Sequence, residues 1–343
     1  MSDFAQTGLI CTLQRLNDTH LARVESELEE IARNRPIALV LPCHGRDLEQ
    51  PAFARLVDEL CGAEFLREIV VTMNGVTPAT RKTFPVRLSS LPQKITILQN
   101  EASAHEPAGK GWNVRAAFEH LVHEGECEFI ATQDCDVASF RRVDLARLCY
   151  AVAHPDLGYR FAKMYYSRVT DRLYGRVSRL FLAPFLHAVV RVAGHQPLVD
   201  FLLSFRYPLA GEVALTRELA AVLPVSSGWG LEIGQLCEVF RRVDPREVCQ
   251  VDGGAGYDHK HQPAATALVE MVAEIARELF SQLAAEGLAN DAAFQTAVAA
   301  AYCREAAHAL RRSASLALIN GLPFDETAEK AIVETFAARL APG

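Results

Sequence analysis

Short apolar runs alternate with amphipathic stretches along the first 150 residues. The apolar runs lie at residues 37–42, 69–71, 95–98 and 129–131. In segments 51–66 and 112–123 the apolar side chains instead recur three or four positions apart. Residues 21–31, near the start of the chain, show the same spacing. The first pattern is typical of buried parallel strands and the second of amphipathic helices. Strands that alternate with helices predict an α/β fold with a doubly wound, mostly parallel sheet.

The pattern changes after residue 150. Tyr and Arg cluster at 159–179, and an apolar run follows at 180–190. Residues 205–235 carry several Gly and Pro, which predicts a loop-rich segment. Beyond residue 263 helical periodicity continues to about residue 340, which predicts a C-terminal helical extension. The run 180–190 is too short to span a bilayer, so we expect a buried or interface helix and no membrane span.

Composition narrows the class of protein. Half of the 343 residues are hydrophobic and 22% are charged, which is ordinary for a globular chain. A net charge of −7 argues against nucleic acid as a partner. The nine cysteines form no C-x-x-C pair and the N-terminus carries no secretory pattern. We therefore expect a cytoplasmic protein with reduced thiols.

The tripeptide Asp134-Cys135-Asp136 directly follows the last apolar run. Two carboxylates at i and i+2 beyond a strand suit a hard divalent cation that also binds a diphosphate. Segments 42–47 and 73–75 follow two other predicted strands. Because ligands of such sheets bind beyond the carboxyl ends of the strands, these three segments are expected to converge on one site.

Two further segments could bind anions. Lys110 lies between Gly109 and Gly111 before a predicted helix, and Arg176 lies in the Gly-Arg-Val-Ser sequence at 175–178. Helix N-termini with small and cationic residues bind phosphates or carboxylates. A plain turn at Lys110, and a surface arginine with a helix cap at Arg176, are the structural alternatives.

Three other positions carry candidate chemistry. His259 and His261 flank Lys260 beside Asp258, a pattern that suits a metal ligand or an exposed loop. Glu212 and Glu232 are each framed by apolar residues and glycines. Such acids are either functional or held in a structural ion pair.

Taken in order, these segments resemble glycosyltransferase family 81, the glucosyl-3-phosphoglycerate synthase group, over about residues 37–262. The resemblance implies a GT-A fold, in which 1–150 forms a Rossmann-like half that binds a nucleotide sugar. Residues 151–262 would form the acceptor half and 263–343 the helical extension. It also implies a homodimer, and retaining transfer of glucose or mannose from a UDP- or GDP-sugar to a small anionic acceptor such as 3-phosphoglycerate.

The resemblance also implies a role for individual residues. Asp136 and His259 would bind Mg or Mn, and Glu232 would lie by the donor sugar or the acceptor hydroxyl. The donor-binding residues would be Pro42, Cys43, Asp47, Asn74, Lys110, Asp134 and Asp136. The acceptor phosphate would be bound by Gly175, Arg176 and Ser178.

The chain departs from the family pattern in three places. Residues 42–47 read PCHGRD where the family has PALNEE, and 73–78 read MNGVTP where it has DSGSTD. Tyr257 replaces an arginine two residues before the predicted metal histidine. These differences leave the base, the sugar and the acceptor open. A nucleotidyltransferase and a non-catalytic sugar-nucleotide-binding protein remain alternative functions.

Overall fold

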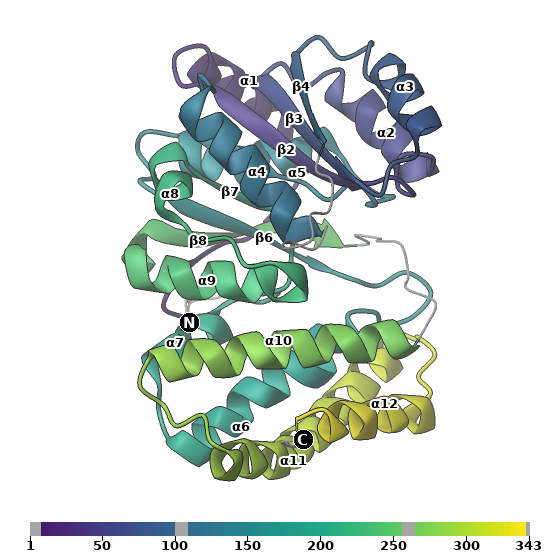
Figure 1. Ribbon diagram of the computed structural model, residues 1–343, viewed down its shortest axis with the longest axis vertical. Helices are drawn as coiled ribbons and strands as arrows, with labels where there is room; N and C mark the ends of the chain where they lie inside the picture. Colours follow the sequence, from purple (N-terminus) through teal and green to yellow (C-terminus); the bar gives the residue numbers. More distant parts are fainter. Residues whose placement is uncertain (1–7, 100–108, 256–264, 341–343) are drawn as a thin grey trace.

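One eight-stranded sheet forms the centre of the protein in a computed structural model that describes residues 8–99, 109–255 and 265–340 (Figure 1). The strands are β1 (Cys11–Leu13), β2 (Ile37–His44), β3 (Leu66–Asn74), β4 (Lys94–Gln99), β5 (Phe129–Thr132), β6 (Phe161–Ser167), β7 (Val213–Thr216) and β8 (Val248–Ala255). Their order is β1-β8-β6-β7-β5-β2-β3-β4. Strand β7 is antiparallel to β5 and β6, and the other neighbours are parallel.

Helices cover both faces of this sheet. Those of the first half are α1 (Leu21–Ala32), α2 (Pro51–Leu60), α3 (Pro78–Arg87), α4 (Lys110–His123) and α5 (Arg142–Ala153). After β6 come α6 (Ala183–Ala193), α7 (Pro197–Ser204), α8 (Arg217–Val222), α9 (Leu231–Arg242), α10 (Ala265–Ala285), α11 (Ala292–Ile319) and α12 (Glu326–Ala338). A π-helical turn, Val177–Leu182, leads into α6 and a 3₁₀ turn, Gly228–Gly230, leads into α9.

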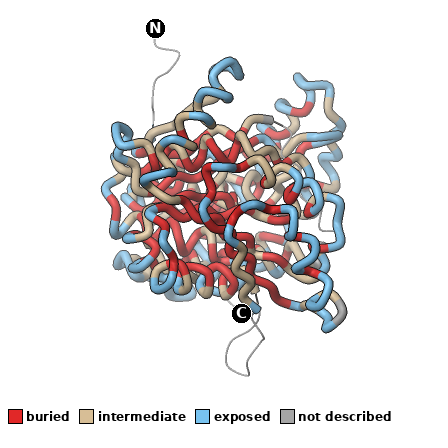
Figure 2. The backbone as a smooth tube through the Cα atoms, turned by 90° about the horizontal axis from the view of Figure 1, so that it is seen from above, coloured by how far each residue is buried: buried red, intermediate tan, exposed pale blue. Residues whose placement is uncertain are grey.

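The pleat of β2 explains why its sequence is a continuous apolar run. Ile37, Leu39 and Leu41 pack into a core with α1, α2, α3 and α5. Ala38 and Val40 point to the opposite face, where α4 and the later helices form a second core. Both faces of the strand are therefore buried, and Figure 2 shows the buried backbone concentrated in the middle of the molecule.

The mostly parallel sheet with a C-terminal set of helices confirms the predicted fold class. Each of the four predicted strands is present, at β2, β3, β4 and β5. The prediction of a loop-rich segment at 205–235 is wrong in part, because β7, α8 and the start of α9 lie there. The helix predicted over 51–66 ends at Leu60, since β3 begins at Leu66.

The apolar run 180–190 forms the end of the π-helical turn and most of α6. Phe185, Leu186 and Val189 are fully buried, and α6 packs against α11 within the same chain. Figure 1 shows α6 and α10–α12 together below the sheet. No helix in the described part of the chain combines the length and apolarity that crossing a bilayer requires. The division at residues 150 and 262 stays a prediction.

Helix α12 is joined to the segment before α6 by buried charge. Glu329 is 4% exposed, and its carboxylate accepts hydrogen bonds from Arg176 Nε at 2.7 Å and from Arg179 Nη2. Both arginines belong to the chain between β6 and α6. One carboxylate of the C-terminal helices thus holds two arginines, one within the segment 175–178 and one directly after it.

Glu329→Ala should therefore lower the free energy of unfolding by about 3 kcal/mol, because it leaves two partly buried guanidinium groups without their acid. Urea unfolding followed by circular dichroism measures the change. Glu119→Ala is the matched control, since Glu119 pairs with Arg115 at 2.9 Å on the exposed face of α4 and should cost less than about 1 kcal/mol. Equal losses in the two variants would contradict the structural role of Glu329.

Candidate active site

The strand order creates a switch point between β2 and β5. Strands β3 and β4 extend the sheet on one side of β2, and the chain then returns to form β5 on the other side. Such a point opens a crevice beyond the carboxyl ends of the strands. Asp134 follows β5 there, and Arg168 follows β6 at the same edge. Because β7 runs antiparallel, the residues that precede it, Ala210 to Glu212, also reach this edge.

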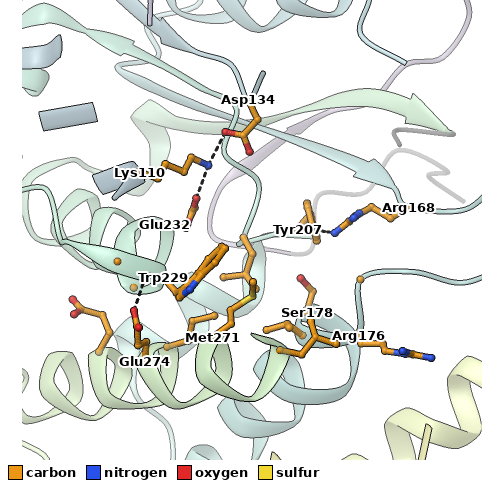
Figure 3. A pocket seen from close by; sticks show the side chains of 18 of the residues that line it. Lys110, Asp134, Arg168, Arg176, Ser178, Tyr207, Trp229, Glu232, Met271 and Glu274 are labelled. Carbon is orange, nitrogen blue, oxygen red and sulfur yellow. Dashed lines mark hydrogen bonds and ion pairs between the residues drawn. The ribbon is translucent and has the colours of Figure 1, made fainter. Parts of the chain in front are cut away.

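Lys110 connects two acids at this edge. Its Nζ lies 2.7 Å from Asp134 Oδ1 and 2.9 Å from Glu232 Oε1 (Figure 3). Lys110 begins α4, Asp134 follows β5, and Glu232 lies in the first turn of α9. Burial opposes the charge of Lys110, yet the two carboxylates raise its pKa well above the ordinary value. The ammonium group stays protonated and joins three elements that are remote in sequence.

Gly211 lies directly against this ion pair. A methyl group added at Gly211 would lie 2.6 Å from both carboxylate oxygens of Asp134, which is closer than real contacts allow. The carbonyl oxygen of Gly211 accepts a hydrogen bond from Thr132 Oγ1 at 2.6 Å, which fixes the glycine beside β5. The small residue therefore leaves the space that Lys110 and Asp134 occupy.

A buried polar layer supports the ion pair from below. Glu212 is fully buried and accepts hydrogen bonds from Tyr166 Oη at 2.9 Å and from Gln133 Nε2 at 3.3 Å. Lys163 is also fully buried and donates to the carbonyl oxygen of Ala210 at 2.6 Å. Burial lowers the pKa of Lys163 to about 8, although Glu232 and Glu212 oppose that shift. This layer holds the strand ends in place, and only Tyr166 of these four residues lines the cavity.

The thiol between the two acids points into the fold. Cys135 and Cys43 are 3% and 1% exposed, and their Sγ atoms lie 2.6 Å apart as free thiols. Burial raises the pKa of Cys135 well above its ordinary value. Cys135 therefore packs inward, while Asp134 and Asp136 on either side line the cavity.

A single cavity of about 1070 Å³ extends from this cluster toward the C-terminal helices. The predicted acceptor residues, Gly175, Arg176 and Ser178, line this cavity, and so does one face of α10. That face contributes Leu268, Met271, Glu274, Ile275 and Glu278. Helix α10 also fixes the loop before α9, because Glu274 accepts a hydrogen bond from Trp229 N at 2.9 Å and Glu278 from Ser226 Oγ at 3.1 Å. A cavity of this volume has room for two small ligands.

The structure brings most of the predicted site residues together. Those that line the cavity are Lys110, Asp134, Asp136, Gly175, Arg176, Ser178 and Glu232. The other predicted donor residues lie nearby but not on its wall: Pro42, Cys43, Asp47 and Asn74. The ends of β2 and β3 and the turn after β2 are joined, since the carbonyl oxygen of Asn74 accepts from Gly45 N at 2.9 Å and Asp47 Oδ2 from His44 N at 3.3 Å.

The predicted metal pair can be placed only in part. Asp136 lines the cavity, whereas His259 lies outside the described residues. Among the residues that are described, no group of three or more His, Cys, Asp or Glu side chains is arranged to hold a metal. Asp136 nevertheless offers carboxylate oxygens to the cavity, and such oxygens suit Mg²⁺ or Mn²⁺.

Several cavity residues carried no clear sequence signal. Arg168 follows β6, Tyr207 lies between α7 and β7 beside it, and Met271 comes from α10 (Figure 3). Burial raises the pKa of Tyr207, so its hydroxyl stays neutral. The spacing of Leu268, Met271 and Ile275 predicts one apolar helix face, but a helical period does not reveal what that face covers.

Solved structures of known proteins share this architecture. Glucosyl-3-phosphoglycerate synthase of Mycobacterium tuberculosis, in complex with Mn²⁺, UDP-glucose and phosphoglyceric acid, matches with a TM-score of 0.61 and 21% identity. The match covers 80% of this chain and 87% of that one. A second complex of the same enzyme, with Mn²⁺, UDP and phosphoglyceric acid, gives 0.61 and 22% over 81% and 87% of the two chains. The fold is thus that of GT-A glycosyltransferases.

Sequence relatives specify the family. Glucosyl-3-phosphoglycerate synthase of Persephonella marina is 34% identical, over 99% of this chain and 89% of its own. The enzyme of the same name from Methanococcoides burtonii is 27% identical, over 90% and 81%. A scan against protein-family models finds no match. The chain belongs to the glucosyl-3-phosphoglycerate synthase family and is a glycosyltransferase.

Gly211→Ala tests the tight packing at the ion pair. The added methyl group meets only the ends of flexible side chains, so the fold should persist while Asp134 and Lys110 are displaced. A displacement of about 1 Å at a reacting site costs about 100-fold in turnover. Initial rates of glycosyl transfer and far-UV circular dichroism measure the two effects.

Gly109→Ala is the control, because a methyl group added at Gly109 has no atom within 4 Å. Its extended backbone, with φ of −173°, accepts any residue. Similar rates in the Gly211 variant and the wild type would show that the close approach has no functional meaning.

Proposed function

We propose that the protein transfers glucose from UDP-glucose to 3-phosphoglycerate with a divalent cation, and that the anomeric configuration is retained. One observation carries the proposal: a single cavity joins the Lys110–Asp134–Glu232 cluster to the segment 175–178. The chain that forms this cavity is 34% identical to an enzyme named for this product. The solved relatives with UDP-glucose and phosphoglyceric acid support the same pair of substrates.

The donor is proposed to bind at the carboxyl ends of β2, β3 and β5. Lys110 would reach the diphosphate, and Asp134 would face the ribose or the nucleoside. The base would lie against the ends of β2 and β3 and the turn after β2, where Pro42, Cys43, Asp47 and Asn74 lie. Since the family's acid is replaced by Met73, contacts to uracil there would come mainly from backbone groups.

A divalent cation fits the charges at this end of the cavity. The ammonium group of Lys110 already faces two carboxylates, so a diphosphate beside it requires additional positive charge. We propose that Asp136 and His259 hold Mg²⁺ or Mn²⁺. When bound, the ion would supply Lewis-acid stabilisation of the departing diphosphate.

The acceptor is proposed to bind at the other end of the cavity. The backbone of Gly175, the Ser178 hydroxyl and the remaining N–H groups of Arg176 would hold its phosphate. Arg176 uses Nε for Glu329, which leaves its terminal nitrogens for a ligand. Glu232 would lie between the donor sugar and the acceptor hydroxyl, and its contact with Lys110 orients its carboxylate.

Retention follows if the acceptor hydroxyl attacks the anomeric carbon from the face that the diphosphate leaves. A phosphate oxygen of the leaving group would then accept the hydroxyl proton, and no enzyme nucleophile is needed. Lys110 would stabilise the negative charge that develops on the leaving group. Glu232 would orient the sugar for front-face attack.

The decisive test is an assay of UDP release from UDP-glucose with and without 3-phosphoglycerate. Release that depends on the acceptor, with a product of α configuration by NMR, supports the proposal. Pyrophosphate release from UTP and a sugar phosphate would support a nucleotidyltransferase instead. Binding of UDP-glucose without any turnover would support a sugar-nucleotide-binding protein.

Asp136→Ala should abolish UDP release, because it removes the carboxylate proposed to bind the cation. EDTA should abolish it in the wild type as well, and excess Mg²⁺ or Mn²⁺ should restore it. Asp58→Asn, an exposed change on α2, is the matched control and should keep full activity. Full activity in Asp136→Ala would overturn the metal site.

We also propose that the protein is a cytoplasmic homodimer, as the family resemblance implies. Helix α6 is buried within its own chain, so the interface would need another surface. Analytical ultracentrifugation measures the mass directly, and a monomer at micromolar concentration would contradict this part of the proposal.

A further inference from the structure

Arg168 is a cation of the cavity that has no part in the proposed binding of the donor, the metal ion or the acceptor phosphate. It follows β6 directly and lines the cavity together with Asp136, Ser178 and Tyr207. Its Nη1 lies 3.4 Å from the hydroxyl oxygen of Tyr207, a long hydrogen bond (Figure 3). Its Nε is buried and has no hydrogen-bond partner among the described residues. A buried N–H without an acceptor destabilises a fold unless a ligand satisfies it.

The other described arginines of the cavity differ from Arg168. Arg176 pairs with Glu329 at 2.7 Å, and Arg172 lies 3.5 Å from an oxygen of Asp171. Arg277 on α10 is exposed to solvent. Arg168 makes no ion pair with a described carboxylate, and its guanidinium therefore keeps its capacity to bind an anionic ligand.

The position of Arg168 indicates which anion it faces. Arg168 follows β6 at the strand edge where Asp134 follows β5, and it lines the same cavity as Asp136. Ser178 and Arg176, from the segment proposed to hold the phosphate, lie below Tyr207 and Arg168 in Figure 3, on the side away from Asp134. In 3-phosphoglycerate the reacting hydroxyl is on the carbon next to the carboxylate, and the phosphate is one carbon further away. The carboxylate is therefore the acceptor anion nearest the donor.

We propose that Arg168 binds the carboxylate of the acceptor and makes the enzyme select a 2-hydroxycarboxylate. The fork of N–H donors on a guanidinium matches the two oxygens of a carboxylate. Tyr207 positions the fork, because the tyrosine is packed against Tyr166 with ring centroids 5.0 Å apart. This inference rests on the proposed function, since it concerns the same acceptor.

Glycerol 3-phosphate is the probe that isolates this contact. It has the phosphate and the secondary hydroxyl of 3-phosphoglycerate, but a neutral hydroxymethyl group replaces the carboxylate. Arg168→Gln should lower kcat/KM for 3-phosphoglycerate by about 10- to 100-fold, as expected for a charged hydrogen bond, and by less than about 3-fold for glycerol 3-phosphate. Arg168→Lys keeps the charge and should give a smaller loss with the same selectivity.

Arg160→Gln is the matched control. Arg160 precedes β6 at the opposite end of the strand and lies 3.7 Å from Glu247. It should leave the kinetics with both acceptors unchanged.

Calorimetric titration of each acceptor into enzyme with UDP and Mn²⁺ gives a readout that needs no turnover. If the wild type transfers no sugar, the proposed function fails. Even then, if Arg168→Gln bound 3-phosphoglycerate more weakly and glycerol 3-phosphate as tightly as the wild type does, the carboxylate contact would be supported.

Three results would overturn the inference. Equal losses for both acceptors would mean that Arg168 is structural. A higher KM for UDP-glucose with unchanged acceptor preference would mean that it binds the donor diphosphate. A wild type that does not discriminate between the two acceptors would show that no residue reads the carboxylate. Arg168→Lys decides between these results if Arg168→Gln does not fold.

Discussion

The contact of one ammonium group with two carboxylates organises the whole cavity. Lys110, Asp134 and Glu232 come from α4, the end of β5 and α9, so their geometry depends on how the two halves of the sheet and the helices above them are packed. Like charges on Asp134 and Glu232 would repel without the lysine between them. The same lysine needs both acids because it is largely surrounded by protein. Each charge is thus tolerated because the other two are present, and a shift in any of the three elements disturbs all of them.

The antiparallel strand β7 makes this arrangement possible. In a purely parallel sheet, the residues that precede a strand lie at the edge remote from the site. Reversal of β7 brings Gly211 and Glu212 to the catalytic edge, where the glycine leaves room for the ion pair and the buried acid holds Tyr166. The neighbouring β6 then delivers Lys163 below the site and Arg168 into the cavity. The inverted strand therefore adds Gly211 and Glu212 to the residues at this edge of the sheet.

Features that depend on neighbouring residues could be predicted from the sequence, whereas contacts between residues distant in the sequence could not. Strands β2 to β5 could be predicted because buried parallel strands are continuous apolar runs, and the acids after β5 could be predicted from that position. Strand β7 has four residues and depends on partners on both sides, so no local pattern reveals it. The contact between Lys110 and Glu232 joins residues 122 positions apart, which periodicity cannot supply. Arg168 lies in a stretch rich in arginine, where a lone guanidinium is usually at the surface, and only the cavity distinguishes it from its neighbours.

The carboxylate of Glu329 carries a consequence for exchanging segments between related chains. It ties the segment after β6 to α12 through Arg176 and Arg179. A change in the segment after β6 therefore alters the surroundings of Glu329, and a change in α12 alters those of Arg176 and Arg179. Exchange of the 160–180 segment between relatives would transplant one half of a charge pair and leave the other behind. The geometry of the segment 175–178 is in that sense a property shared by two distant parts of the chain.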